Sequence, residues 1–416
     1  MTPPGKKVHE KDLVGTQVVD YEQRVDINRL RKDRLHKLQA EMAAADIEAV
    51  LFFDPVNIRY AIGSRLNETF GLRFKGAHVL VPQEGRPVFF DSNELHTERF
   101  AEDAEMLPAI GVEFWLLGEF TRDSTLEWAQ VIKDTLVSLG ISSQRLGIDR
   151  LDAFTFNALQ ERGFSFVDAL EPLSRARSIK TPDEIALVRQ ACAIGDVGLA
   201  KVQEAIKPGV TENDLFALLQ HYNLSRGGER IDGKLLTAGG NTNPWIKRDA
   251  SDRLVMPGNL VAIDTDMAGP LGYFADISRT YLCGDVNPNE EQMDAYKRAY
   301  DYIYSTIPYF VPGASFAEVA EKAPTIPAEY NRNRYPLMAH GAGMSDEWPA
   351  IYFKDPRPDE PANYPGEIRE NMVICMEASF GREHGTEQVK LEEQLLIKAD
   401  GPEILSQAPF DWRFMD

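Results

Sequence analysis

The stretch from Val261 to Cys283 constrains the fold of this 416-residue chain more than any other. Two apolar, β-branched runs flank its glycine- and proline-rich centre, a pattern that predicts two strands joined by a turn. Side chains alternate faces along a strand, so we expect Asp264 and Asp266 to point the same way and the return strand to bring Asp276 toward them. Three crowded carboxylates repel one another, and a divalent metal is the simplest counter-ion. The alternative is a solvated acidic edge of the hairpin, which the core-like flanking residues disfavour.

The composition excludes several classes of protein. Acidic residues outnumber basic ones by 65 to 45, and the net charge of −20 disfavours nonspecific binding to nucleic acid or to an anionic membrane. No apolar run is long enough to span a membrane, and the N-terminus lacks the apolar core of a signal peptide. The three cysteines, Cys192, Cys283 and Cys375, show no CxxC spacing, so reduced, buried thiols are expected rather than disulfides or a zinc site. We therefore expect a cytoplasmic protein.

The N-terminal half alternates predicted helices and strands. Residues 1–24 are polar and predict an irregular arm. Apolar periodicity predicts helices at residues 29–45 and 127–139, and apolar runs predict strands at residues 49–53, 76–81, 87–91 and 145–149. Strands that alternate with helices are typical of an α/β domain.

A domain junction is predicted at residues 174–185. Thr181 is a good N-cap, Pro182 fits the first helical position, and Glu184 completes a capping box. We therefore expect an N-terminal domain over residues 25–175 and a C-terminal domain over residues 176–416.

Further candidate ligands follow downstream. His340 stands among glycines, which allow close approach of a ligand, although a lone histidine is more often structural. Glu377 and Glu392 each interrupt an apolar predicted strand, where a carboxylate is costly unless it is paired or metal-bound. Glu392 and Glu393 alternate faces, so only one of them can point inward. With the three aspartates these residues form an oxygen-rich set that suits Mn²⁺, Fe or Zn²⁺ as a bridged pair.

The order of these residues resembles the metal site of the pita-bread metallopeptidases, a group that includes prolidase, aminopeptidase P, methionine aminopeptidase and creatinase. The junction at residues 177–185 also resembles the start of their catalytic domain. Within the group the chain resembles in particular the P-type dimethylsulfoniopropionate lyases of marine bacteria. The shared motifs are Asp54-Pro-Val-Asn-Ile-Arg-Tyr, Thr242-Asn-Pro-Trp, Asp264-Thr-Asp, Asp276-Ile-Ser-Arg-Thr, Leu337-Met-x-His-Gly-x-Gly-x-x-Asp-Glu-Trp-Pro and Lys390-Leu-Glu.

The resemblance implies a creatinase-like α/β N-terminal domain, a pita-bread catalytic domain and a homodimer. It also implies two divalent metal ions per chain, iron above Mn or Zn, and Asp346 as the catalytic base. The ligands that it implies are Asp264, Asp266, Asp276, His340, Glu377 and Glu392.

Departures from the peptidases favour the lyase. The peptidases carry an imidazole where this chain has Thr242-Asn-Pro-Trp245, and another near Asp346. Without these groups peptide hydrolysis loses acid/base and electrophilic help. An Xaa-Pro-type peptidase and a non-catalytic binding protein remain as alternatives.

The implied substrate is a short zwitterion with a carboxylate and a dimethylsulfonium group, although a related sulfonium, betaine or β-substituted acid fits as well. Asp346 would need a raised pKa, which desolvation by Trp348 could supply. Trp245, Trp348 and Tyr60 are candidates for holding the onium group, with plain core packing as the alternative. Glu347 faces the opposite way from Asp346 in an extended segment, so its replacement by Gln is expected to be nearly silent, although the sequence leaves open which of the two is the base.

Overall fold

The structure is a computed structural model that describes residues 25–64, 76–91, 104–109, 118–245 and 248–415. The arm predicted at residues 1–24 lies outside the described residues. The chain divides into two compact units, one built on Asp26–Arg177 and the other on Ser178–Asp416. Among the described helices, none combines the length and the apolar character that a membrane crossing requires.

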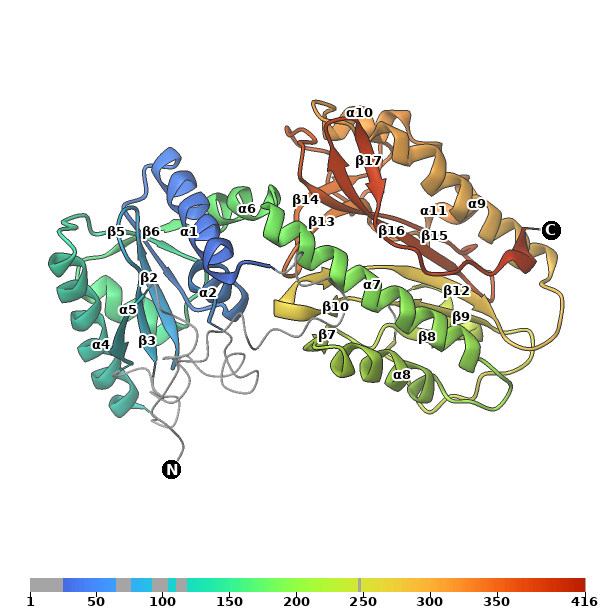
Figure 1. The fold of residues 1–416 in the computed structure, drawn as a ribbon, viewed down its shortest axis with the longest axis horizontal. Helices are drawn as coiled ribbons and strands as arrows, with labels where there is room; N and C mark the ends of the chain where they lie inside the picture. Colours follow the sequence, from blue (N-terminus) through green and yellow to red (C-terminus); the bar gives the residue numbers. More distant parts are fainter. Residues whose placement is uncertain (1–24, 65–75, 92–103, 110–117, 246–247, 416) are drawn as a thin grey trace. The chain divides into compact units, whose positions relative to one another are not determined.

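The first unit is built around a six-stranded mixed sheet in the order β4-β3-β2-β1-β5-β6 (Figure 1). β1 pairs antiparallel with β2 and parallel with β5, and β1 and β2 are buried along their whole length, as their continuous apolar runs predict. The helix expected at residues 127–139 begins earlier, at Glu119. The elements are α1 (Ile27–Ala44), β1 (Ala49–Phe52), α2 (Pro55–Ile62), β2 (His78–Pro82), β3 (Val88–Asp91), β4 (Glu105–Pro108), α4 (Glu119–Ser138), β5 (Arg145–Ile148), α5 (Ala153–Glu161), β6 (Ser165–Asp168) and α6 (Leu170–Ser178).

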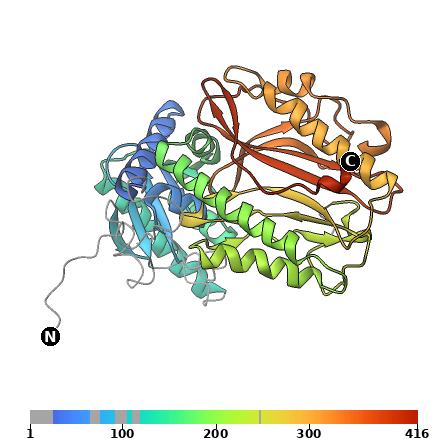
Figure 2. The ribbon, with the colours of Figure 1, turned by 45° about the vertical axis from the view of Figure 1, so that its right-hand side comes forward.

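The second unit contains a five-stranded antiparallel sheet and two three-stranded ones (Figures 1 and 2). Their orders are β14-β13-β15-β16-β17, β12-β9-β8 and β11-β10-β7. The elements are α7 (Pro182–Ala205), α8 (Glu212–Ser225), β7 (Arg230–Ile231), β8 (Leu236–Ala238), β9 (Leu260–Asp264), β10 (Met267–Ala268), β11 (Phe274–Ala275), β12 (Ser278–Leu282), α9 (Glu290–Thr306), α10 (Phe316–Lys322), α11 (Ala328–Asn331), β13 (Leu337–Ala342), β14 (Asp346–Tyr352), β15 (Val373–Phe380), β16 (Val389–Lys398) and β17 (Gly401–Ile404).

Helices pack on these sheets and bury their apolar side chains. α9 packs on β15 and β16, and its buried face joins the main apolar cluster of the unit through residues such as Tyr296 and Ile303. α7 packs along α8 and against β11. α7 starts where the sequence predicts, because Thr181 and Glu184 form a reciprocal capping box.

The acidic stretch forms a hairpin, but its strands are interrupted. β9 pairs with β12 and β10 with β11. Between β9 and β10, Thr265 Oγ1 donates to the Ala275 carbonyl oxygen at 2.7 Å and accepts from the Ile277 N–H at 2.9 Å. Asp266 follows with a φ of +33°. The expectation that one continuous strand carries both Asp264 and Asp266 is therefore wrong, because the break at Thr265 places Asp266 outside β9. The carboxylates of Asp264, Asp266 and Asp276 nevertheless come together, as expected.

Candidate metal centre

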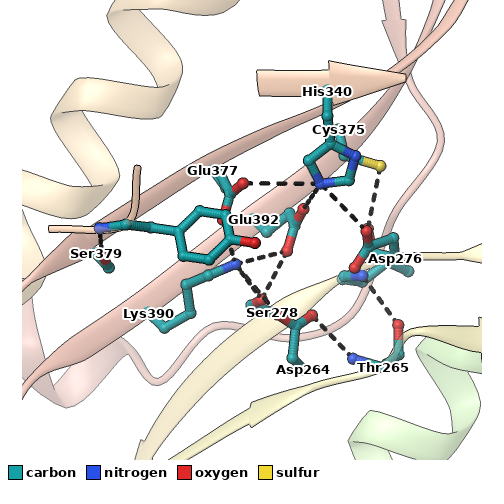
Figure 3. A network of polar contacts seen from close by, with 12 residues as sticks. Asp264, Thr265, Asp276, Ser278, His340, Cys375, Glu377, Ser379, Lys390 and Glu392 are labelled. Carbon is teal, nitrogen blue, oxygen red and sulfur yellow. Dashed lines mark hydrogen bonds and ion pairs between the residues drawn. The ribbon is translucent and has the colours of Figure 1, made fainter. Parts of the chain in front are cut away.

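The centre lies where the hairpin strands β9 and β12 meet β16 of the five-stranded sheet. The register of β13, β15 and β16 places His340 opposite Cys375, and Glu377 opposite Glu392. Cys375 and Glu377 are two residues apart on one strand, so they share a face. The sheet thereby presents these four side chains toward the aspartates of the hairpin (Figure 3).

The acidic side chains converge on the imidazole of His340 (Figure 3). Its Nε2 lies 3.5 Å from Asp276 Oδ2, 3.7 Å from Glu377 Oε1 and 3.6 Å from Glu392 Oε1. One carboxylate oxygen from each aspartate of the hairpin lies within 4.8 Å of the others. The structure therefore gathers all the proposed ligands into one continuous cluster: Asp264, Asp266, Asp276, His340, Glu377 and Glu392.

A buried lysine sits among these carboxylates. Lys390 Nζ lies 3.2 Å from Asp264 Oδ2 and 2.8 Å from both Glu377 Oε2 and Glu392 Oε2. It also donates to Ser278 Oγ at 2.9 Å. Sequence reasoning did not assign Lys390 a role. The signal was present, because Lys390 stands two residues before Glu392 on one strand and therefore shares its face.

Burial and like charge set the pKa values of the carboxylates. Burial raises the pKa of Asp276 and of Asp266 well above the usual range, and neighbouring carboxylates raise both further. Burial also raises the pKa of Glu377, to about 7, although the Lys390 ammonium lowers it. For Glu392 burial is outweighed by Lys390 and by the imidazole, which together hold its pKa below the usual range.

The free donor atoms of the cluster fit a divalent metal centre. Asp276 Oδ1, Glu377 Oε1 and Glu392 Oε1 are buried without a hydrogen-bond partner among the described residues. A buried oxygen without a partner is costly, so these atoms are suited to a cation. His340 Nδ1 lies 3.1 Å from the Gly341 carbonyl oxygen, and a hydrogen bond there turns the lone pair of Nε2 toward the carboxylates.

Protonation of His340 competes with such a metal. Burial lowers the pKa of this imidazole, but Glu392 and Glu377 outweigh burial and raise the pKa to about 10. A metal ligand must be the neutral imidazole. Metal binding would therefore release a proton from His340 at neutral pH.

Asp346 lies at the open side of the cluster, as the first residue of β14 and opposite Ala342. Its side chain is exposed to solvent, yet protein atoms surround it closely enough for burial to raise its pKa. The charge of Glu392 raises the pKa further, whereas His340 lowers it. A raised carboxyl pKa at the edge of a metal cluster is typical of a general base.

Glu347 turns away from the cluster. Its Oε1 accepts from the Met344 N–H at 2.8 Å, and its Oε2 lies 3.1 Å from Lys180 Nζ. The side chains of this ion pair are only 1% and 5% exposed. The expectation that Glu347→Gln is nearly silent for turnover stays a prediction, and the structure adds a cost in stability, because the variant breaks a buried ion pair.

The three aromatic residues proposed to hold the onium group, Trp245, Trp348 and Tyr60, have different surroundings in the structure. Trp348 is partly buried and packs against Phe316, a member of the apolar cluster of the unit, with the two ring centroids 5.6 Å apart. Trp245 is buried, and its Nε1 has no hydrogen-bond partner among the described residues. Tyr60 belongs to the first unit, where its hydroxyl donates to the Ala176 carbonyl oxygen at 3.0 Å. A role for any of these rings in substrate binding stays a prediction.

One aromatic ring that the sequence did not single out lies beside the cluster. Lys390 Nζ lies 5.7 Å from the ring centroid of Tyr335, and the Tyr335 N–H donates to Ser379 Oγ at 2.7 Å. Burial raises the pKa of Tyr335, and Glu377 raises it further. The ring is only half-buried, so one part of it remains accessible.

Two family models match the chain. The model described as metallopeptidase family M24 matches residues 186–399, and the model described as the creatinase/prolidase N-terminal domain matches residues 34–179. Two curated relatives are the dimethylsulfoniopropionate lyases DddP of Roseovarius nubinhibens and Roseobacter denitrificans, each 29% identical over 93% of this chain and 87% of the relative. An Xaa-Pro dipeptidase of Pyrococcus furiosus is 26% identical over 90% of this chain and 98% of the relative.

Solved prolidase structures share the fold. A prolidase from Thermococcus sibiricus superposes with a TM-score of 0.75 at 21% identity, covering 92% of this chain and 98% of that one. The prolidase of Pyrococcus horikoshii gives 0.72 at 22% identity, covering 91% and 99%. The predicted fold class is therefore confirmed: a creatinase-like α/β unit followed by a pita-bread unit.

Proposed function

We propose that this chain, which belongs to metallopeptidase family M24, is a metal-dependent lyase that cleaves dimethylsulfoniopropionate to dimethyl sulfide and acrylate. Enzymes of this family use a dinuclear divalent metal centre. The observation that carries the proposal is Asp346: a carboxylate with a raised pKa stands at the open side of the cluster, where the peptidases carry an additional imidazole. The two DddP relatives support the same reading.

The reaction is a β-elimination. Asp346 takes the proton from the carbon next to the substrate carboxylate, the C–H electron pair forms the new double bond, and the C–S bond breaks with its electrons on sulfur. Dimethyl sulfide leaves as a neutral molecule, and acrylate keeps the carboxylate. Divalent metal held by the cluster would supply Lewis-acid stabilisation of the charge that develops on the substrate carboxylate. A pKa raised by burial makes Asp346 a stronger base than a solvated carboxylate.

The onium end of the substrate needs a different kind of contact. A dimethylsulfonium group has no hydrogen-bond donor, and aromatic faces hold such groups. Tyr335 is the half-buried ring beside the cluster, and Lys390 already lies near it. We therefore add Tyr335 to Trp245 and Trp348 as a candidate wall for the sulfonium.

The second candidate function is hydrolysis of Xaa-Pro dipeptides. It is favoured by the shared carboxylate and imidazole cluster and by the dipeptidase relative of Pyrococcus furiosus. It is disfavoured because His340 is the only imidazole that the described residues contribute to the cluster. The peptidases use further imidazoles to hold the peptide and to support its tetrahedral intermediate.

The test is headspace gas chromatography of dimethyl sulfide from the purified, metal-loaded protein, beside an assay with the dipeptide Ala-Pro. The wild type should release dimethyl sulfide and leave Ala-Pro intact. Asp346→Asn should lower the rate roughly 10²–10⁴-fold while metal content and folding stay unchanged. The matched control is Asp252→Asn, at an exposed aspartate outside the cluster, which should behave like the wild type. Hydrolysis of Ala-Pro without release of dimethyl sulfide would overturn the lyase in favour of the peptidase.

A further inference from the structure

A cysteine thiol lies inside the metal cluster. Cys375 stands directly opposite His340 on β13, and its side chain is fully buried on the same face of the sheet as Glu377 (Figure 3). Its Sγ and one donor atom each of Asp276, His340 and Glu392 all lie within 4.8 Å of one another. The only acceptor for this thiol among the described residues is the Asp276 carbonyl oxygen, at the long distance of 3.8 Å.

A second, independent observation points to a ligand at this place. Asp276 Oδ1 and Glu392 Oε1 are buried beside the thiol and have no hydrogen-bond partner among the described residues. Their side chains are only 3% and 1% exposed, so water does not satisfy these oxygens from the bulk. An ion about 2.0–2.3 Å from each of its donors holds those donors within about 4.6 Å of one another. The four donor atoms nearly meet that condition as they stand.

We propose that Cys375 supplies a sulfur donor to the metal centre and thereby biases the centre toward thiophilic divalent ions such as Fe²⁺, Co²⁺ and Zn²⁺ over Mg²⁺ and Mn²⁺. Thiolate is a soft ligand that selects such ions, whereas carboxylates alone suit the harder ones. On binding, the S–H bond breaks, the proton goes to solvent, and the sulfur electron pair forms the bond to the ion. No oxidant or reductant takes part.

Cys192 provides the matched control. It is a second fully buried thiol of the same unit, and its Sγ donates to Gln394 Oε1 at 3.3 Å. Gln394 lies opposite Cys375 on β16, so the two thiols share a neighbourhood. Cys192 is nevertheless absent from the cluster of donor atoms that surrounds His340. The two buried cysteines therefore differ in whether the thiol lies among the donor atoms around His340.

The experiment uses the full-length protein loaded with Co²⁺. A thiolate bound to Co²⁺ gives a charge-transfer band in the near ultraviolet, whereas carboxylate and imidazole ligands leave only the weaker visible bands. The wild type and Cys192→Ser should show the band, and Cys375→Ser should lose it while keeping the visible bands. Cys375→Ser should also narrow the preference for Zn²⁺ over Mn²⁺ in competition titrations. A band that survives in Cys375→Ser, or that disappears in Cys192→Ser instead, would overturn the proposal.

A second measurement uses the wild type alone and therefore does not require that the Cys375→Ser variant fold. X-ray absorption at the metal edge of the Co²⁺ or Zn²⁺ protein should require a sulfur scatterer at about 2.3 Å. A coordination sphere fitted by oxygen and nitrogen alone refutes the sulfur donor. The inference rests on the proposed metal centre but not on the reaction. A protein that releases dimethyl sulfide without metal–sulfur scattering contradicts only the inference, and the converse result contradicts only the lyase.

Discussion

Removal of the metal should make the stability of the protein fall as the pH rises. The metal-free cluster crowds five carboxylates, four of them buried and that of Asp266 partly buried, and folding raises the pKa of most of them. Glu377 has a pKa of about 7 in the folded protein against 4.5 as its ordinary value. A carboxyl group with a raised pKa stabilises the fold fully below pH 4.5, and this contribution is lost as the pH rises through about 7.

The size of the effect follows from the pKa shift. The shift of Glu377 corresponds to about 3 kcal/mol of free energy of unfolding. His340 acts in the same direction, because its pKa rises from 6.5 to about 10 and its contribution is lost across that interval. Glu392 has a lowered pKa, so its contribution is lost only as the solution becomes more acidic than its ordinary value of 4.5. A loss of about 3 kcal/mol lowers the Tm of a domain of this size by roughly 6–12 °C.

The assay is differential scanning calorimetry of chelator-treated and metal-loaded protein at about pH 5.5, pH 7 and pH 8.5. The metal-free Tm should fall across this series, and the gap to the metal-loaded Tm should widen, because bound metal keeps its ligands deprotonated throughout. Glu377→Gln carries a neutral amide at the same place, so its metal-free slope should be shallower. A metal-free Tm that stays constant or rises with pH would refute the reasoning.

Two further predictions concern the buried lysines. Lys390→Met should destabilise the metal-free protein by about 3–5 kcal/mol in urea unfolding, because it leaves the carboxylates around it without their cation. Lys390→Arg should keep most of the stability, and a methionine variant as stable as the wild type would contradict this role. Glu347→Gln should cost about 3 kcal/mol, because it leaves Lys180 buried without its partner, yet dimethyl sulfide release per folded molecule should persist. Loss of activity with unchanged stability would instead make Glu347 the base.

Local sequence signals predicted the frame of the fold. The capping box that begins at Thr181 needs only residues within one turn, and the structure contains it. The apolar runs around Glu377 and Glu392 form strands that are buried on both faces, apart from the last residue of β16, Lys398. The cost of burying a carboxylate in such strands was enough to single out both residues before the register was known.

Features that depend on contacts between residues far apart in the chain could not be predicted from the sequence. The break at Thr265 arises from hydrogen bonds to residues ten and twelve positions later, which no local pattern reveals. The pairing of β13 with β14 has a register shift between His340 and Gly341. This irregularity changes which face of the sheet the side chains after Asp346 point to. Strict alternation along β14 therefore could not place Trp348, which is partly buried against the apolar cluster. The ion pair between Lys180 and Glu347 spans 167 residues and likewise has no local signature.

The charges of the cluster show why Asp346 is available as a base. Among the described residues, the ligands contribute five carboxylates, and Lys390 is the one ammonium group that contacts them. When His340 is neutral, four negative charges remain, which is the charge that two divalent ions neutralise. Asp346 is then a carboxylate in excess of a neutral set, at an exposed position beside the cluster. When Asp346 takes a proton from the substrate, it loses a negative charge that no cation of this set balances. Its protonation therefore lowers the excess negative charge of the site. The same balance requires that Asp346→Asn leave the number of bound metal ions unchanged, whereas replacement of a ligand such as Asp276 by Ala should lower it.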